Sequence, residues 1–339
     1  MTAPKQTMND WRAPWWLGGG GVVGGNLQTI WPARLSKHWP RQHLPFTGRL
    51  QRVDTPDGDF VDFDWLVEPH LPDTPVLIVF HGLEGSSSSH YAQAWAHWAW
   101  EQGWGCVVPH FRGCSGEPNR LPRAYHSGDF AEVGWMIDQV VAARPQAPCM
   151  AVGISLGGNA LLRWAQEAGH TGASKLKAVA AVSSPLDLAA AGHAIGQGFN
   201  RRVYTRMFLD SMKPKMQAKL QQWPGFINAK AMLASRDLYE YDNAVTAPIH
   251  GFANTEDYWS RCSAGPRLKD LVGMPALVLN ALNDPFLPPS ALPRPDQVSP
   301  WVTLWQPPHG GHVGFPGGHW PGHVAPMPSA VGEWFKQHL

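Results

Sequence analysis

The chain has 339 residues, of which 44% are hydrophobic, so it can form one large domain with an insertion around a sizeable core. Its 27 basic and 26 acidic side chains give a net charge of +1, which favours neither nucleic acid nor an anionic membrane as a partner. Four cysteines without paired spacing indicate reduced structural thiols. Because no apolar leader or membrane-spanning run is visible, we expect a soluble, cytoplasmic protein.

The N-terminal segment, residues 1–45, is rich in Pro, Gly and Trp and has little periodicity, so we expect an irregular arm packed on the core. The chain holds 18 tryptophans, which crowd this arm and one later segment: Trp11, Trp15, Trp16, Trp31, Trp39, Trp95, Trp98, Trp100 and Trp104. Bulky core filling explains most of them. The alternative is that some line an apolar substrate channel or contact a membrane surface.

A β-hairpin follows the arm. Its predicted strands are 49–53 and 60–66, and the turn is Pro56-Asp57-Gly58. In the second strand apolar residues alternate with Asp62 and Asp64, which predicts burial of one face only, as at the antiparallel edge of a sheet.

From Val76 onward, apolar strands alternate with helices, which predicts a mostly parallel, doubly wound α/β sheet with right-handed crossovers. Functional loops of such a sheet gather at the carboxyl ends of its strands. The predicted strands are 76–80, 105–109, 150–154, 178–182, 276–280 and 302–305, and the predicted helices are 88–103, 129–144, 156–168 and 329–337.

Residues 185–268 interrupt this alternation and have the pattern of several helices. We interpret them as a helical cap inserted between the two parts of the core, residues 46–184 and 269–339. The basic residues between Arg201 and Lys219 are interpreted as a solvated face in preference to an anion site.

Gly153-x-Ser155-x-Gly157 lies between the predicted strand 150–154 and the helix after it. In this setting the pattern is a nucleophile elbow, in which a sharp turn requires glycine at 153 and 157 and leaves the serine strained and exposed. The alternative is a glycine-rich turn whose serine caps a helix.

A serine nucleophile needs a base and an acid that orients the base. Asp284 directly follows the strand that ends at Asn280, and His312 follows the last strand in a Gly-Gly-His-Val-Gly sequence. This serine–acid–histidine order is the one that α/β-hydrolases use. His309 and His319 remain alternatives for the base.

The oxyanion formed on an attacked carbonyl needs two preorganised donors. The backbone N–H of Leu156, directly after the serine, is one candidate. The loop His81-Gly82-Leu83 follows an early strand, which makes the Leu83 N–H the second candidate.

Three other functions are compatible with parts of the pattern. His309, His312, His319 and His323 are spaced like metal ligands, but intervening prolines break any helix that could align them, and we expect no metal or other cofactor. An acyltransferase would use the same triad as a hydrolase. A non-catalytic binding protein would usually have lost a triad residue.

Over most of its length the chain resembles the YheT-like branch of the α/β-hydrolase superfamily, which also holds plant embryogenesis-associated proteins and animal α/β-hydrolase-domain lipases. The resemblance implies hydrolysis of carboxylic esters, with short acyl esters or monoacylglycerols as substrates, and a triad of Ser155, Asp284 and His312. One departure is Asn26, where many relatives have His. The motifs that carry the resemblance are G-N-L-Q-T-I at 25–30, H-G-L-E-G at 81–85, F-R-G-C-S-G-E-P-N at 111–119, Y-H-S-G-D at 125–129, G-I-S-L-G-G-N at 153–159, T-A-P-I-H-G-F at 246–252 and G-G-H-V-G-F at 310–315.

Overall fold

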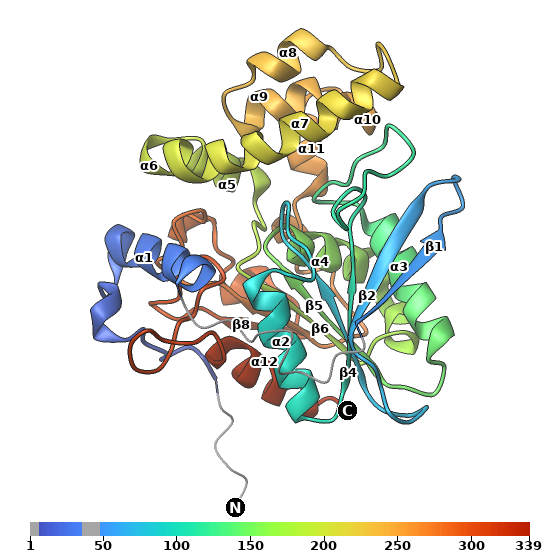
Figure 1. Cartoon of the computed structure of the whole chain (residues 1–339). Helices are drawn as coiled ribbons and strands as arrows, with labels where there is room; N and C mark the ends of the chain where they lie inside the picture. Colours follow the sequence, from blue (N-terminus) through green and yellow to red (C-terminus); the bar gives the residue numbers. More distant parts are fainter. Residues whose placement is uncertain (1–6, 36–47) are drawn as a thin grey trace, which may run out of the picture.

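An eight-stranded sheet forms the centre of the computed structural model, which describes residues 7–35 and 48–339 (Figure 1). The strand order is β1-β2-β4-β3-β5-β6-β7-β8; β1 and β2 are antiparallel to their neighbours and the other six strands are parallel. This confirms the predicted mostly parallel sheet with an antiparallel edge. The strands are β1 (Arg49–Asp54), β2 (Phe60–Val67), β3 (Val76–Phe80), β4 (Gly105–Pro109), β5 (Cys149–Ile154), β6 (Ala178–Val182), β7 (Ala276–Leu279) and β8 (Val302–Trp305).

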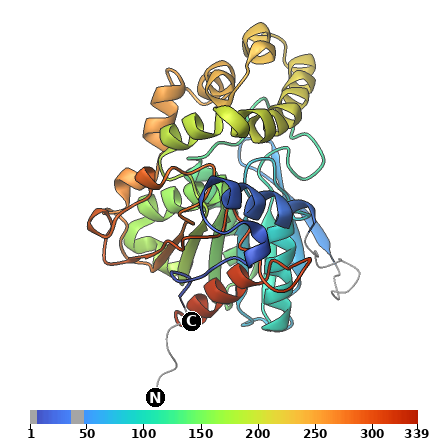
Figure 2. The same ribbon diagram turned by 90° about the vertical axis from the view of Figure 1, so that its left-hand side faces the viewer.

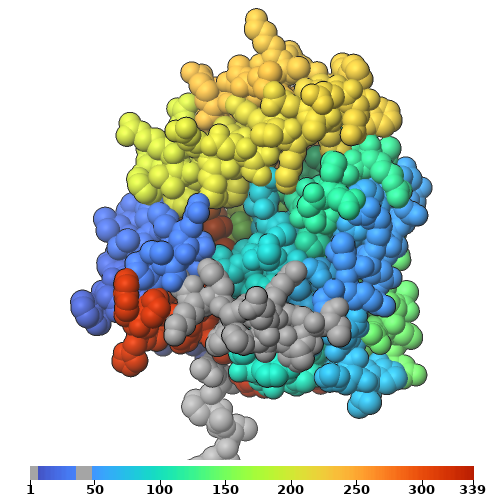
Figure 3. Space-filling model, viewed as in Figure 1, coloured from blue at the N-terminus to red at the C-terminus, as the bar shows by residue number. Residues whose placement is uncertain are grey.

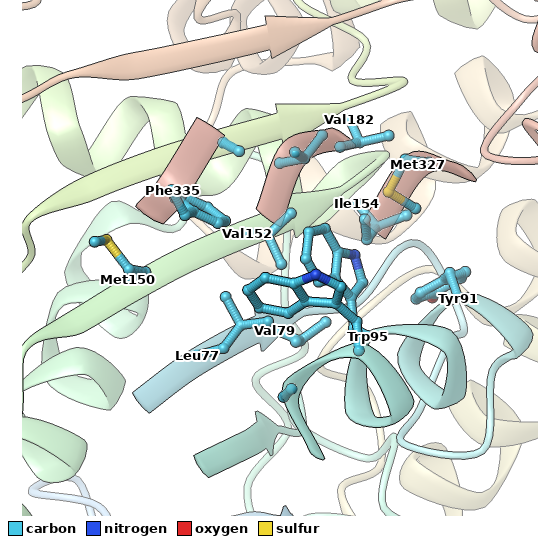
Figure 4. Packing of buried hydrophobic residues seen from close by; sticks show 14 of the residues in the cluster. Leu77, Val79, Tyr91, Trp95, Met150, Val152, Ile154, Val182, Met327 and Phe335 are labelled. Atoms are coloured by element: carbon cyan, nitrogen blue, oxygen red, sulfur yellow. The ribbon is translucent and has the colours of Figure 1, made fainter. Parts of the chain in front are cut away.

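Helices cover both faces of the sheet, so its central strands are apolar on both sides. Helices α2 (His90–Glu101) and α12 (Pro326–Lys336) pack on one face, and α3 (Phe130–Ala143) and α4 (Leu156–Ala168) pack on the other. Figure 4 shows the first of these cores, where Leu77 and Val79 of β3 lie beside the indole of Trp95 from α2. Trp95, Trp98 and Trp104 are buried there, which confirms core filling for these three.

The prediction that β2 buries only one face was wrong, because all eight of its residues are buried. Val61 and Phe63 belong to one core and Leu66 and Val67 to the other. Asp62 tolerates burial because both of its carboxylate oxygens accept hydrogen bonds of 2.8 Å from Arg52 on β1.

The expected irregular arm is also wrong over part of its length. It contains a short 3₁₀ helix, η1 (Trp15–Leu17), and helix α1 (Gly21–Arg34). The G-N-L-Q-T-I motif lies within α1, where Thr29 Oγ1 donates a hydrogen bond of 2.7 Å to the carbonyl of Gly25. Residues 1–6 and 36–45 of the arm, including Trp39, lie outside the described residues.

A block of helices connects β6 to β7 and lies above the carboxyl ends of the parallel strands (Figures 1 and 2). Of the basic residues in this block, Arg201, Arg202 and Arg206 are exposed, as expected. Lys219 is not: it is 6% exposed, and its Nζ donates to the carbonyls of Asn119 and Leu121. The helices are α5 (Leu188–Ile195), α6 (Gly198–Asn200), the π-helix η4 (Arg201–Thr205), α7 (Arg206–Gln222), α8 (Ala229–Ala234), α9 (Leu238–Ala244), α10 (Thr246–Ile249), α11 (Thr255–Cys262) and the 3₁₀ helix η5 (Gly265–Arg267).

Candidate active site

Ser155 lies in a tight turn between β5 and α4. Its φ of +52° is in the left-handed region, which a serine occupies only under constraint. A Cβ on Gly153 would lie 2.4 Å from the carbonyl oxygen of Gly157, and a Cβ on Gly157 would lie 2.5 Å from that of His81. The predicted need for glycine at both positions is therefore confirmed, and the local geometry is that of a nucleophile elbow.

Three side chains distant in sequence are connected by hydrogen bonds at this turn. Ser155 Oγ lies 2.9 Å from His312 Nε2, and His312 Nδ1 lies 2.9 Å from Asp284 Oδ2. Burial raises the pKa of Asp284, whereas its interaction with His312 and a hydrogen bond from the Phe286 N–H oppose that rise. An ionised Asp284 accepts a hydrogen bond from Nδ1–H and thereby leaves Nε2 as the acceptor that faces the serine hydroxyl.

The other histidines considered from the sequence lie elsewhere. His309 Nδ1 accepts a hydrogen bond of 3.2 Å from the Ala13 N–H, and His319 is exposed. Within the described part of the chain, no three or more His, Cys, Asp or Glu residues form a group that could hold a metal ion. Among the three histidines proposed as the base, His312 is the one bonded to Ser155.

The loop that carries His312 is held by the N-terminal helix, a role that the sequence did not reveal. Gln28 Oε1 accepts hydrogen bonds from Asn283 Nδ2 at 2.9 Å and from the Gly310 N–H at 2.8 Å. Thr29 Oγ1 accepts the N–H of His312 itself at 2.8 Å. The G-N-L-Q-T-I motif was conspicuous in sequence, but nothing local indicates that its polar side chains reach residues about 280 positions away.

The loop after β3 lies against the serine. A Cβ on Gly82 would lie 3.2 Å from the Cβ of Ser155, so the backbone approaches closely there. His81 Nε2 accepts the Phe111 N–H at 3.0 Å, which leaves Nδ1 to donate to the Gly82 carbonyl at 2.8 Å. Burial lowers the pKa of His81 to about 3, so this neutral tautomer persists at physiological pH.

Leu83 and Leu156, the two expected oxyanion donors, line the same cavity as Ser155 and His312. Leu156 is the first residue of α4, so its N–H is one of those that a helix leaves without an intrahelical partner. The positive end of the helix dipole also faces this position. The arrangement is suited to binding negative charge beside Ser155.

Glu84, the residue after Leu83, joins the loop to two other parts of the molecule. Its N–H donates to the Tyr125 hydroxyl at 2.8 Å, and that hydroxyl donates to Glu84 Oε1 at 2.9 Å. Its Oε2 accepts hydrogen bonds from Ser211 Oγ at 2.5 Å and from Lys215 Nζ at 2.7 Å, both on α7. Glu84 has φ of +56°, an unfavourable conformation that these contacts offset.

A cavity of about 600 Å³ opens at Ser155 beneath the helices between β6 and β7. Figure 3 shows a hollow between these helices, in yellow, and the segments below them. Much of the lining surface is apolar, although charged side chains such as Glu84, Lys215 and Asp242 also line the cavity. Burial raises the pKa of Asp242 to about 6. The apolar lining from the helical block includes Leu188, Ile195, Phe208, Met212, Met216, Leu238, Val245 and Trp259.

The R-G-C-S-G-E-P-N motif builds a buried ion network that anchors the hairpin. Arg112 lies 2.8 Å from Asp57, 3.0 Å from Asp59 and 2.6 Å from Glu132. Asn119 donates to Asp59 at 2.6 Å. This motif therefore positions the hairpin.

This fold is that of an α/β-hydrolase, and comparison with known proteins agrees. Residues 75–318 match the family model described as the alpha/beta hydrolase fold, and the chain belongs to this family, in its YheT-like branch. It is 39% identical to the putative esterase YheT of Escherichia coli over 94% of this chain and 92% of that protein. It is 28% identical to the human phospholipase ABHD3 over 82% of this chain and 69% of that protein.

Solved structures share the fold. The esterase Pf2001 of Pyrococcus furiosus superposes with a TM-score of 0.54 at 15% identity, over 90% of this chain and 95% of that one. The predicted fold class is confirmed. In addition, none of the helices in residues 7–35 and 48–339 is both long and apolar enough to cross a bilayer.

Proposed function

We propose that the protein is a serine hydrolase of carboxylic esters that acts through an acyl-enzyme intermediate. The observation that carries the proposal is the pair of 2.9 Å contacts linking Ser155, His312 and Asp284 at an elbow. The names of the relatives, a putative esterase and a phospholipase, support the same chemistry.

In the proposed reaction, Ser155 Oγ attacks the ester carbonyl while His312 Nε2 takes its proton. The N–H groups of Leu83 and Leu156 stabilise the negative charge that forms on the carbonyl oxygen. The carbon–oxygen bond to the alcohol then breaks, and His312 returns the proton to the leaving alcohol. Water, deprotonated by the same histidine, hydrolyses the acyl-enzyme, and Asp284 holds the imidazole tautomer throughout.

The helices of residues 185–268 act as a cap that selects the acyl chain in this proposal. They supply most of the apolar lining of the cavity, and about 600 Å³ accommodates a medium-sized ester. Short acyl esters and monoacylglycerols are the proposed substrate class. Hydrolysis rates for p-nitrophenyl esters from acetate to palmitate, followed by monoacylglycerols, test this class with EDTA present, which should leave the rates unchanged.

An acyltransferase is the second candidate, because an alcohol can take the acyl group in place of water. Adding glycerol at increasing concentration to the p-nitrophenyl butyrate reaction separates the two. A hydrolase releases butyrate in proportion to p-nitrophenol, whereas a transferase forms butyrylglycerol at the expense of butyrate. Release of neither product would leave a non-catalytic binding protein.

A further inference from the structure

Exposed apolar side chains concentrate on one face of the molecule, formed by η1, α1, the start of the cap and one C-terminal loop. Of the 18 large hydrophobic side chains that are exposed in the described parts of the chain, eight belong to this face. We call it the α1 face. Its apolar members are Trp15, Val22, Val23, Leu27, Phe199, Val203, Met207 and Trp320, with exposures from 36% to 89%.

Direct contacts join these segments into one surface. The Tyr204 hydroxyl donates a hydrogen bond of 2.7 Å to Asn26 Oδ1, which links the cap to α1. The ring of Trp31, on α1, packs against Trp16 at 5.3 Å and against Trp320 at 4.5 Å between centroids. Figures 1 and 2 show α1 below the start of the cap in both views. A contiguous apolar surface of this kind marks an interaction site.

The apolar residues at the start of the cap are spaced so that they lie on the same side of their helix. Phe199, Val203 and Met207 recur every four residues, so they lie on one stripe of the helix, while Tyr204 is buried behind them. On α1, Val23 and Leu27 have the same spacing. Both stripes flank the candidate active site, because Tyr204 and the partly buried Ile30 of α1 pack with Phe286, which contacts His312 at 4.1 Å between ring centroids.

The charge beside this surface is positive. Arg201 and Arg202 are exposed, and within residues 7–35 and 48–339 neither forms an ion pair. Arg206 pairs with Asp210 at 3.6 Å, and Glu240, which Arg201 also attracts at longer range, is bonded to Arg236. Although the net charge of the whole chain is nearly zero, Arg201 and Arg202 therefore make the edge of the α1 face locally positive. Exposed Trp and aliphatic side chains next to arginines match the interface of an anionic bilayer, where aromatic rings lie at the headgroups and arginines attract phosphates.

We propose that the α1 face binds the surface of an anionic phospholipid membrane and so places the candidate active site, which this face flanks, next to a lipid phase. The proposal extends the proposed function by naming where its ester substrates reside, but the binding itself needs no turnover. It differs from the expectation based on net charge alone, which favoured no anionic membrane as a partner. A second copy of this chain or another protein would be the competing occupant of the face.

Sedimentation with vesicles of ether-linked phospholipids tests this inference, because these lipids hold no ester and binding is measured without hydrolysis. Phosphatidylcholine vesicles with and without phosphatidylglycerol would be compared. We expect binding to the anionic vesicles that weakens with salt. Val22→Glu/Val23→Glu and Arg201→Glu/Arg202→Glu should each weaken it at least about tenfold.

Matched controls lie at the amino ends of the strands, away from the cap. Leu71→Glu changes another strongly exposed apolar residue, and Lys177→Glu/Lys269→Glu makes the same change of net charge as Arg201→Glu/Arg202→Glu. Both should bind as the wild type does, and all variants should hydrolyse soluble p-nitrophenyl butyrate normally. The inference is overturned if the wild type does not bind, if the α1-face variants bind unchanged, or if the α1-face variants instead dissociate a dimer seen by analytical ultracentrifugation. If neither the wild type nor any variant hydrolysed p-nitrophenyl butyrate, that result would contradict the proposed function but not the membrane binding.

Discussion

Substituting Glu84 by alanine tests how strongly the loop that carries Leu83, the proposed oxyanion donor, depends on one carboxylate. The change removes the hydrogen bonds from Tyr125, Ser211 and Lys215, all between 2.5 and 2.9 Å, at a residue whose carboxylate is only 9% exposed. Each hydrogen bond to a charged group contributes about 1.5–3 kcal/mol to stability. Because all three bonds are lost together, the loop should no longer hold the Leu83 N–H in a fixed position. Loss of one oxyanion donor costs about 10²–10³ in kcat.

We therefore expect kcat of Glu84→Ala for p-nitrophenyl butyrate to fall about a hundredfold while KM changes less than about threefold. Binding of a trifluoromethyl ketone, which forms a tetrahedral adduct, should weaken in parallel with kcat/KM. Glu84→Gln keeps an acceptor for Tyr125 and should lose only about tenfold. Lys175→Met, which breaks an ion pair with Asp138 far from the site, is the control. Normal kcat in a Glu84→Ala protein that remains folded by urea titration would refute this reasoning.

Four further outcomes follow. Asp284→Asn should lower kcat about 10⁴-fold with little loss of stability, measured by single-turnover kinetics and thermal unfolding, since it favours the wrong tautomer of His312. Thr29→Val removes the acceptor for the His312 N–H and should lower kcat about tenfold, whereas Thr29→Ser should restore it. Phe208→Ala should shift the p-nitrophenyl ester profile towards longer chains, and an unchanged profile would mean that the cap does not select substrate. Burial raises the pKa of Asp242 to about 6, so the protonated side chain stabilises the fold fully below about pH 4, and this stabilisation is lost as the pH rises through 6. Asp242→Asn should therefore have a larger free energy of unfolding than the wild type at pH 7.5, by up to about 3 kcal/mol in urea titrations. At pH 4 the two proteins should be equally stable.

The sheet and the elbow were predictable because their signals are local. Continuous apolar runs predict strands covered on both faces, and the pattern around Ser155 needs only a strand before it and a helix after it. The order of Ser155, Asp284 and His312 along the chain, each just past a strand, then placed the candidate acid and the candidate base at the same edge of the sheet.

The contacts that hold the loops around Ser155, and the burial of β2, were not predictable because they depend on segments far apart in sequence. Gln28 and Asn283 are 255 positions apart, and no periodicity in α1 indicates that its polar side chains hold the His312 loop. Glu84 is likewise unremarkable until α7 brings Lys215 to it. Burial of Asp62 was missed because its compensating partner, Arg52, lies on the neighbouring strand, whereas alternation along one strand reports only on that strand.

Covalent labelling of the intact protein with a fluorophosphonate tests the central proposal most directly. A nucleophilic Ser155, activated by His312, should give one adduct per chain by mass spectrometry, on the peptide that contains Ser155, with loss of p-nitrophenyl butyrate hydrolysis in step with labelling. Ser155→Ala should neither label nor turn over, and His312→Ala should label more slowly by about a thousandfold or more. Stoichiometric labelling at another residue, or full hydrolysis by folded Ser155→Ala, would contradict the account.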